Sequence, residues 1–112
     1  MSKLLHRQVV ARARHIISDP ERWTQNELAV SNELVPVEPI DDCADRFCAV
    51  GALIRAAAEL VPDEGDAEQL AYQTHIVLLE FAGVPETTLA CINDQQGREA
   101  VLNLFNSYLV TR

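Results

Sequence analysis

The sequence predicts a mainly α-helical fold, in which a bundle of about four main helices is interrupted by an extended or short-hairpin excursion at about residues 27–42. Apolar residues recur at helical spacing in four stretches that are bounded by proline or glycine signals. Within the excursion, Pro36 and Pro39 exclude both a long helix and a central strand. A chain of 112 residues, 48% of them hydrophobic, has the length and composition of one globular domain, which we place at 1–112.

The first predicted helix ends at Asp19-Pro20, because the residue before a proline disfavours helical angles. Its apolar positions fall on one face: Leu5, Val9, Ala13, Ile16 and Ile17. The excursion that follows mixes apolar residues with serine, asparagine and proline. If it forms a hairpin, we expect the turn at Ser31 and Asn32.

The second predicted helix runs from about residue 44 to residue 60 and is apolar on nearly every side, which is typical of the central helix of a bundle. Three aspartates at 41, 42 and 45 bring negative charge to its predicted start, where the helix dipole favours it.

The third predicted helix has Asp66 as its N-cap and ends at Gly83, in the position of a C-cap glycine. Residues 86–91 are expected to add one short turn. The last helix is expected to begin near Asp94 or Gln95.

The chain is acidic, with a formal net charge of −8, and this opposes binding to nucleic acid, which depends on Lys and Arg at phosphates. Lys3, Arg7, Arg12 and Arg14 are concentrated in the first helix, and we interpret them as a basic face beside an acidic loop. The sequence has no apolar run of membrane-spanning length and no apolar signal-peptide core. Three cysteines, an odd number without export signals, predict free thiols in the cytoplasm.

Cys48 lies in the most informative stretch, R-F-C-A-V-G-A-L at 46–53. The small residues Gly51 and Ala52 allow another backbone or a ligand to approach the helix closely. A thiol near a helix N-terminus can have a lowered pKa, because the dipole favours the thiolate, and this makes Cys48 a candidate catalytic or ligand-binding residue. The competing interpretation, which we favour, is a small buried side chain at a close helix contact.

Two further groups are candidates for a polar site. Trp23 and Gln25 would either wall a pocket or pin the excursion to the core. Asn93, Asp94 and Arg98 fall at the predicted start of the last helix, where an N-cap and an Asp94–Arg98 pair account for them locally. In the alternative interpretation, the same three side chains face a polar ligand or an anion.

The sequence predicts no metal and no cofactor. Cys43 and Cys48 have no close second pair of ligands, as a zinc site needs, and phosphate-loop, paired-histidine and EF-hand motifs are absent. Gln25, Cys48, His75 and Asn93 follow the order of the functional residues in papain-like hydrolases. His75 falls within a predicted helix, however, and such catalysis is recognised by geometry rather than by order.

Three motifs are informative as a set: W-T-Q at 23–25, R-F-C-A-V-G-A-L at 46–53 and I-N-D-Q-Q-G-R at 92–98. Together they resemble a bacterial family of small domains of unknown function, over nearly the whole length of the chain. Members of that family often have W-C-Q-G where this chain has W-T-Q-N, and a tryptophan in place of Ile92. The resemblance implies a shared fold, with helices in the same order, and a shared polar site. It implies no activity.

Three classes of function remain open. We favour a non-enzymatic binding or regulatory module with a protein partner, using a groove between the central helix and residues 23–40; such a module would show an exposed apolar patch or form a homodimer. One alternative is a small-molecule site lined by residues of all three motifs: Trp23, Gln25, Cys48, Asn93, Asp94 and Arg98. It requires that these segments meet with polar groups left over. The other is a thiol-dependent enzyme centred on Cys48.

Overall fold

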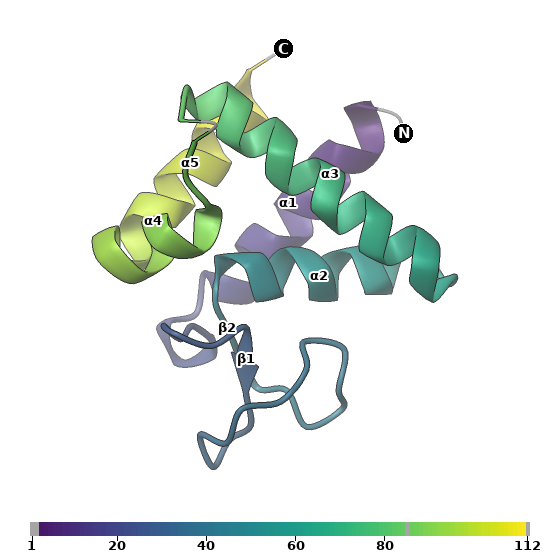
Figure 1. Cartoon of the computed structure of the whole chain (residues 1–112), viewed down its shortest axis with the longest axis vertical. Helices are drawn as coiled ribbons and strands as arrows, with labels where there is room; N and C mark the ends of the chain where they lie inside the picture. The colour runs from purple at the N-terminus through teal and green to yellow at the C-terminus, as the bar shows by residue number, and fades with distance from the viewer. Residues whose placement is uncertain (1–2, 85, 112) are drawn as a thin grey trace.

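The computed structural model describes residues 3–84 and 86–111, and over these residues the fold is mainly helical, as predicted. Five α-helices, one 3₁₀ turn and one pair of two-residue strands make up this part of the chain (Figure 1). In chain order they are α1 (Lys3–Ile17), η1 (Pro20–Arg22), β1 (Ala29–Val30), β2 (Arg46–Phe47), α2 (Ala49–Leu60), α3 (Glu64–Ala82), α4 (Leu89–Gln96) and α5 (Arg98–Val110).

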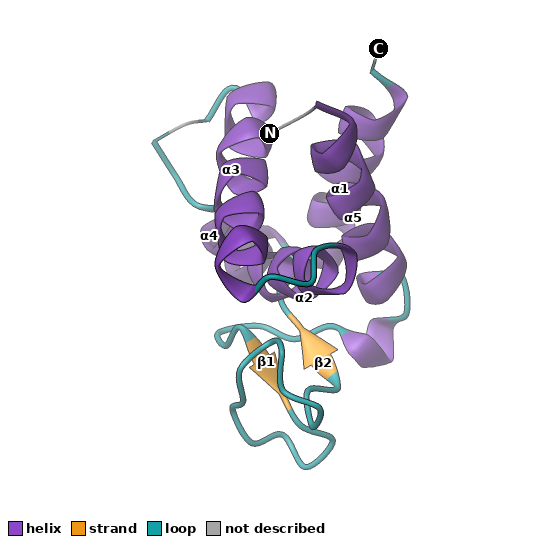
Figure 2. Cartoon of the chain, turned by 90° about the vertical axis from the view of Figure 1, so that its right-hand side faces the viewer, coloured by secondary structure: helices purple, strands orange, loops and turns teal. Residues whose placement is uncertain are grey.

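The helices lie on one side of α2 and the excursion lies on the other, as Figure 2 shows. α2 packs against α1 and α3, while α5 packs against α1, α3 and α4. Large side chains with at most 1% of their surface exposed fill the core: Phe47, Leu53, Leu70, Leu78 and Phe105. No helix within the described residues is long and apolar enough to cross a bilayer.

Helix α2 begins at Ala49, and the prediction that the central helix starts near residue 44 is wrong. The residues before it are extended because β2 pairs with β1 in an antiparallel ladder. Cys48 is the N-cap of α2. The three aspartates predicted at the helix start therefore lie before β2 and not at the start of α2.

The excursion and the adjoining strand β2 are both held to α2. The fully buried Phe47 ring of β2 contacts two guanidinium groups, those of Arg22 and Arg55, at 5.6 and 5.8 Å from its centroid. Such cation–π contacts are stronger where the ring is shielded from water. At Gly51, a Cβ atom would lie 1.8 Å from the carbonyl oxygen of Leu28. The close approach predicted at Gly51 is thus made by the backbone of the excursion.

The predicted turn near Ser31 is present, but the strand pairing differs from the prediction. The Ser31 amide donates to the carbonyl oxygen of Val35 at 2.9 Å, and Val30 forms an isolated bridge with Pro36. Pro36 has no N–H with which to extend this ladder. The second strand of the sheet is therefore β2, which lies beyond the predicted excursion.

The boundaries of α3 follow from its caps. Gly83 adopts a left-handed conformation (φ 76°) at its C-terminus, as predicted, because glycine has no Cβ to oppose it. At its N-terminus the cap is Asp63 and not Asp66. The Asp63 carboxylate accepts a hydrogen bond from the Asp66 amide at 2.9 Å, so the helix begins earlier than predicted.

A separate short helix, α4, occupies the region where a single turn was expected. Thr88 caps it, and its hydroxyl oxygen accepts a backbone hydrogen bond at 3.2 Å. Gly97 (φ 90°) separates α4 from α5. Asn93 and Asp94 therefore lie inside α4, and the prediction that they cap the last helix is wrong.

Candidate functional site

All three sequence motifs meet at one place, which we refer to as the Asn93 joint: residues 23–26, 48–49 and 93–94. The first segment follows η1, the second is the start of α2, and the third belongs to α4. Figure 1 shows α4 beside the first turn of α2, and the two helices are in contact. The convergence brings together five of the six predicted site residues.

Asn93 is at the centre of the joint and is 0% exposed. Its Oδ1 accepts hydrogen bonds from the indole Nε1–H of Trp23 at 2.7 Å and from the backbone N–H of Ala49 at 3.0 Å. Its Nδ2 donates to the carbonyl oxygen of Thr24 and to Oδ1 of Asp94, each at 3.0 Å. An amide side chain has two donors and two acceptor positions, so these four bonds occupy it fully.

Gln25 and Asp94 extend the same network. Gln25 Nε2 donates to the carbonyl oxygens of Asn93 and Asp94 at 3.3 and 3.1 Å. The Asp94 carboxylate also accepts from the backbone N–H of Asn26 at 3.0 Å. Asn26 has a positive φ of 70°, which asparagine tolerates and glycine prefers. This conformation explains a glycine at the same position in the motif of the resembling family.

Cys48 is the part of the joint that carries a thiol, and it is buried, with 3% of its surface exposed. Its Sγ accepts a hydrogen bond from the Gly51 amide at 3.3 Å. Burial raises the pKa of the Cys48 thiol, and this outweighs the backbone hydrogen bonds at the helix start, which lower it; the charge of Asp94 raises it further. Desolvation thus dominates over the helix dipole, and the thiol is protonated at neutral pH.

Arg98 is the predicted site residue that lies outside the joint. Its Nη1 donates to the carbonyl oxygens of Ile17 and Ser18, at 3.3 and 3.0 Å, at the end of α1. A cation is favoured there because the helix dipole is negative at that end. Its Nη2 pairs with Glu99 at 3.0 Å. The expected pairing with Asp94 is replaced by these contacts.

His75 binds the start of α4. Its Nε2 accepts a hydrogen bond from the Leu89 amide at 2.9 Å, so the neutral ring carries its proton on Nδ1. Burial lowers the pKa of His75. A papain-like base would instead bind the cysteine, and Cys48 bonds to Gly51. Among residues 3–84 and 86–111, no group of three or more His, Cys, Asp or Glu is placed to hold a metal ion.

A second feature is a groove of about 560 Å³ between α2, the start of α3 and the excursion, which we refer to as the α2 groove. It lies where the sequence analysis placed one. One part of its lining is an apolar stripe at intervals of four and three residues, made by Ile54 and Ala58 of α2 and by Val61, the C-cap residue of that helix. Its remaining lining residues come from the excursion and the start of α3: Leu28, Glu38, Pro39, Ile40, Pro62, Glu64, Ala67 and Glu68.

Sequence reasoning did not name these groove residues. The stripe on α2 has helical spacing, but α2 is apolar on nearly every side, so the stripe that stays outside the core is visible only once α1 and α3 are placed. The acidic residues from α3 reach the groove through tertiary packing, for which the sequence holds no local signal.

The fold and the joint define a small, mainly helical protein whose motif residues tie three distant segments together. Residues 1–107 match the family of unknown function DUF6197, and the chain belongs to this family. The matched range includes all three motifs of the joint. No curated protein and no solved structure matches the chain.

Proposed function

We propose that this chain is a protein-binding module whose α2 groove takes an apolar segment of a partner protein with Lys or Arg beside its apolar residues. The observation that carries the proposal is the exposure of large apolar side chains in the groove. Leu28 and Ile40 are 44% and 40% exposed, whereas Ala29, next to Leu28, is 1% exposed. Apolar surface rimmed by polar residues is typical of an interaction site.

The charge of the groove favours a basic partner. Glu38, Glu64 and Glu68 line it, and no Lys, Arg or His is among its described lining residues. The net charge of −8 adds a field of the same sign. Complementary charge speeds association and disfavours acidic partners, and salt screens both effects.

The apolar stripe of the groove suits an amphipathic helix. The stripe follows the end of α2 for about 9 Å from Ile54 to Leu60, at 1.5 Å per residue, and ends at the C-cap residue Val61. A helix laid along it would place two or three apolar side chains, spaced three or four residues apart, in the groove. Its Lys or Arg residues would then lie near the glutamates of the rim.

A matched pair of synthetic peptides tests the charge requirement. Both carry leucines at i, i+4 and i+7, one flanked by lysines and the other by glutamates. The methyl NMR signals of Ile40 and Ile54 report binding directly. We expect shifts with the lysine peptide that weaken as salt is added, and none with the glutamate peptide. Equal binding of both peptides would contradict the proposal.

A pair of substitutions in the excursion tests the location. Leu28→Asp places a charge in the groove and should weaken binding of the lysine peptide about tenfold or more, because one apolar anchor is lost. Leu34→Asp is the control: Leu34 is 64% exposed and is not among the groove residues. If both variants bind alike, the groove is not the docking site.

A second copy of the chain is the other occupant to test, since the sequence also allows a homodimer. Sedimentation of the chain alone would reveal a dimer, and a dimer that Leu28→Asp disperses would replace a foreign partner in this proposal. A small-molecule or thiol-dependent site around Cys48 is the alternative function. It has less support, because the thiol is buried and protonated and the amide of Asn93 is fully hydrogen-bonded within the chain.

A further inference from the structure

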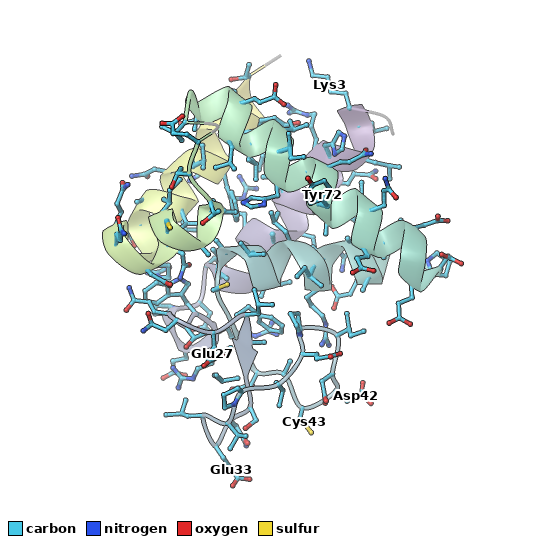
Figure 3. All side chains as sticks on the ribbon, in the orientation of Figure 1. Lys3, Glu27, Glu33, Asp42, Cys43 and Tyr72 are labelled. Atoms are coloured by element: carbon cyan, nitrogen blue, oxygen red, sulfur yellow. The ribbon has the colours of Figure 1, made fainter. Side chains whose placement is uncertain are left out.

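A cavity at the other end of the molecule is distinct from both the joint and the groove. Its volume is about 430 Å³, and it lies where α1, α3 and α5 pack against one another. Its lining includes Lys3, His6 and Arg7 of α1 together with Phe81 of α3 and Tyr108 of α5. Figure 3 shows Lys3 at the opposite end of the molecule from Glu27, Glu33 and Asp42 of the excursion.

The charge of this cavity is opposite to that of the chain. Two cationic side chains, Lys3 and Arg7, line it beside His6, whose pKa is lowered by burial. No Asp or Glu is among its described lining residues, although the chain has 17 acidic residues against 9 Lys and Arg. Positions 3, 6 and 7 fall on one face of α1, because residues three and four apart are neighbours on a helix. A concave basic surface concentrates anions and repels cations.

Two of the basic side chains are held in place by the protein. The Arg7 guanidinium donates to the carbonyl oxygens of Tyr108, Leu109 and Thr111 at the end of α5. These bonds fix its position in the cavity wall. The guanidinium keeps its positive charge, because the three acceptors are uncharged carbonyl groups and do not use all of its five N–H donors.

His6 is 8% exposed and is oriented by Thr74. The Thr74 hydroxyl donates its single proton to the carbonyl oxygen of Leu70 at 2.7 Å. His6 Nδ1 must therefore be the donor in its 2.8 Å contact with the Thr74 oxygen. The other ring nitrogen, Nε2, is not bonded to Thr74.

Two aromatic rings also line the cavity. The Phe81 and Tyr108 rings form an edge-to-face pair, with centroids 5.5 Å apart and an interplanar angle of 85°. Phe81 is 39% exposed, so an apolar group placed against it would remove a large apolar surface from water. A cavity lined by both aromatic and cationic side chains fits a ligand that has an apolar body and a single negative charge.

We propose that this cavity binds a small organic acid, with its carboxylate beside Lys3 and Arg7 and its apolar or aromatic body against Phe81 and Tyr108. No covalent step is involved. The site is independent of the α2 groove, so either can fail without the other.

Phenylacetate is a suitable probe, with phenylacetamide as its uncharged counterpart and phenethylamine as a cationic one. NMR titration of the folded chain should show phenylacetate shifting the ring signals of His6, Phe81 and Tyr108, with those of the exposed His15 on the same helix unchanged. The amide should bind about fivefold more weakly and the amine more weakly still. Equal or tighter binding of the amide or the amine would overturn the proposal, as would the absence of any shift at millimolar phenylacetate.

A matched pair of substitutions tests whether the carboxylate of phenylacetate binds beside Lys3. Lys3→Gln should weaken phenylacetate binding about threefold to fivefold, since it removes one exposed partner of the carboxylate. Arg12→Gln makes the same change of net charge on the same helix, outside the cavity, and should leave the affinity within about twofold. Lys3 and Arg12 are both exposed, so neither change is expected to disturb folding. An equal effect of the two would show a general response to charge and would contradict this site.

Discussion

Replacing Asn93 by aspartate tests the Asn93 joint with a change of one group. The two hydrogen bonds that Oδ1 accepts, from Trp23 and Ala49, can be kept. The two that Nδ2 donates, to the Thr24 carbonyl and the Asp94 carboxylate, become contacts between oxygen atoms at about the same 3.0 Å. One of these faces a negative charge.

The expected cost follows from those two contacts. A buried polar group left without its partner costs about 1–3 kcal/mol, and more when it is charged. We therefore expect Asn93→Asp to lower the free energy of unfolding by about 3–5 kcal/mol at neutral pH. For a domain whose whole stability is about 5–15 kcal/mol, this is a large part.

The loss should depend on pH in a defined direction. Burial and the facing acceptors raise the pKa of the introduced carboxyl above its unfolded value of about 3.9. A protonated carboxyl regains one donor, so the stability of the variant relative to wild type is greatest below this unfolded value. It is lost as the pH rises through the folded pKa.

Urea unfolding followed by tryptophan fluorescence measures this directly, because Trp23 is the sole tryptophan and donates to Asn93. Asn103→Asp is the matched control, at an exposed position of α5. The reasoning would be refuted if the two variants lost similar stability, or if the deficit of Asn93→Asp did not change between acid and neutral pH.

Two further changes test other parts of the fold. Gly51→Ala should lower the free energy of unfolding in urea by about 3 kcal/mol, because its Cβ would lie 1.8 Å from the Leu28 carbonyl oxygen. Gly65→Ala is the control: its Cβ would lie 3.3 Å from a flexible Asp63 oxygen, and its effect should stay within about 1 kcal/mol. Equal effects of the two substitutions would contradict the close packing at Gly51. Acidification below 6.5, the ordinary pKa of histidine, should lower stability, because burial lowers the pKa of His75 and the unfolded chain binds the proton first. His75→Gln should reduce the dependence of stability on pH, and the substitution His15→Gln at an exposed position should not. Urea midpoints measured at several pH values around 6.5 would show this. The same pH dependence in both variants would exclude His75 as its source.

The sequence predicted those parts of the fold that local chemistry determines. The end of α1 and the left-handed Gly83 depend on a proline and a glycine at the right positions, and both predictions are confirmed. The start of α2 was missed because aspartates at 41, 42 and 45 suit the N-terminus of a helix, whereas pairing with β1 holds the residues just before α2 extended.

The candidate site was predicted in composition but not in arrangement. The motifs identified Trp23, Gln25, Cys48, Asn93 and Asp94, which the fold does bring together. Their roles were not visible, because an asparagine before an acidic residue also suits an N-cap, and only tertiary packing places Asn93 inside α4 with four partners. Whether any of them contacts a ligand stays a prediction.

The central claim is that the Asn93 joint, which includes Cys48, holds the fold together and is not a reactive site. Alkylation of the folded chain with iodoacetamide, with each cysteine resolved by peptide mass spectrometry, tests it most directly. Cys43 and Cys91 are exposed and serve as internal references. The account predicts that both react in the folded protein, while Cys48 reacts only as denaturant unfolds the chain. Rapid modification of Cys48 in the folded state, below the ordinary thiol pKa of 9.0, would contradict it.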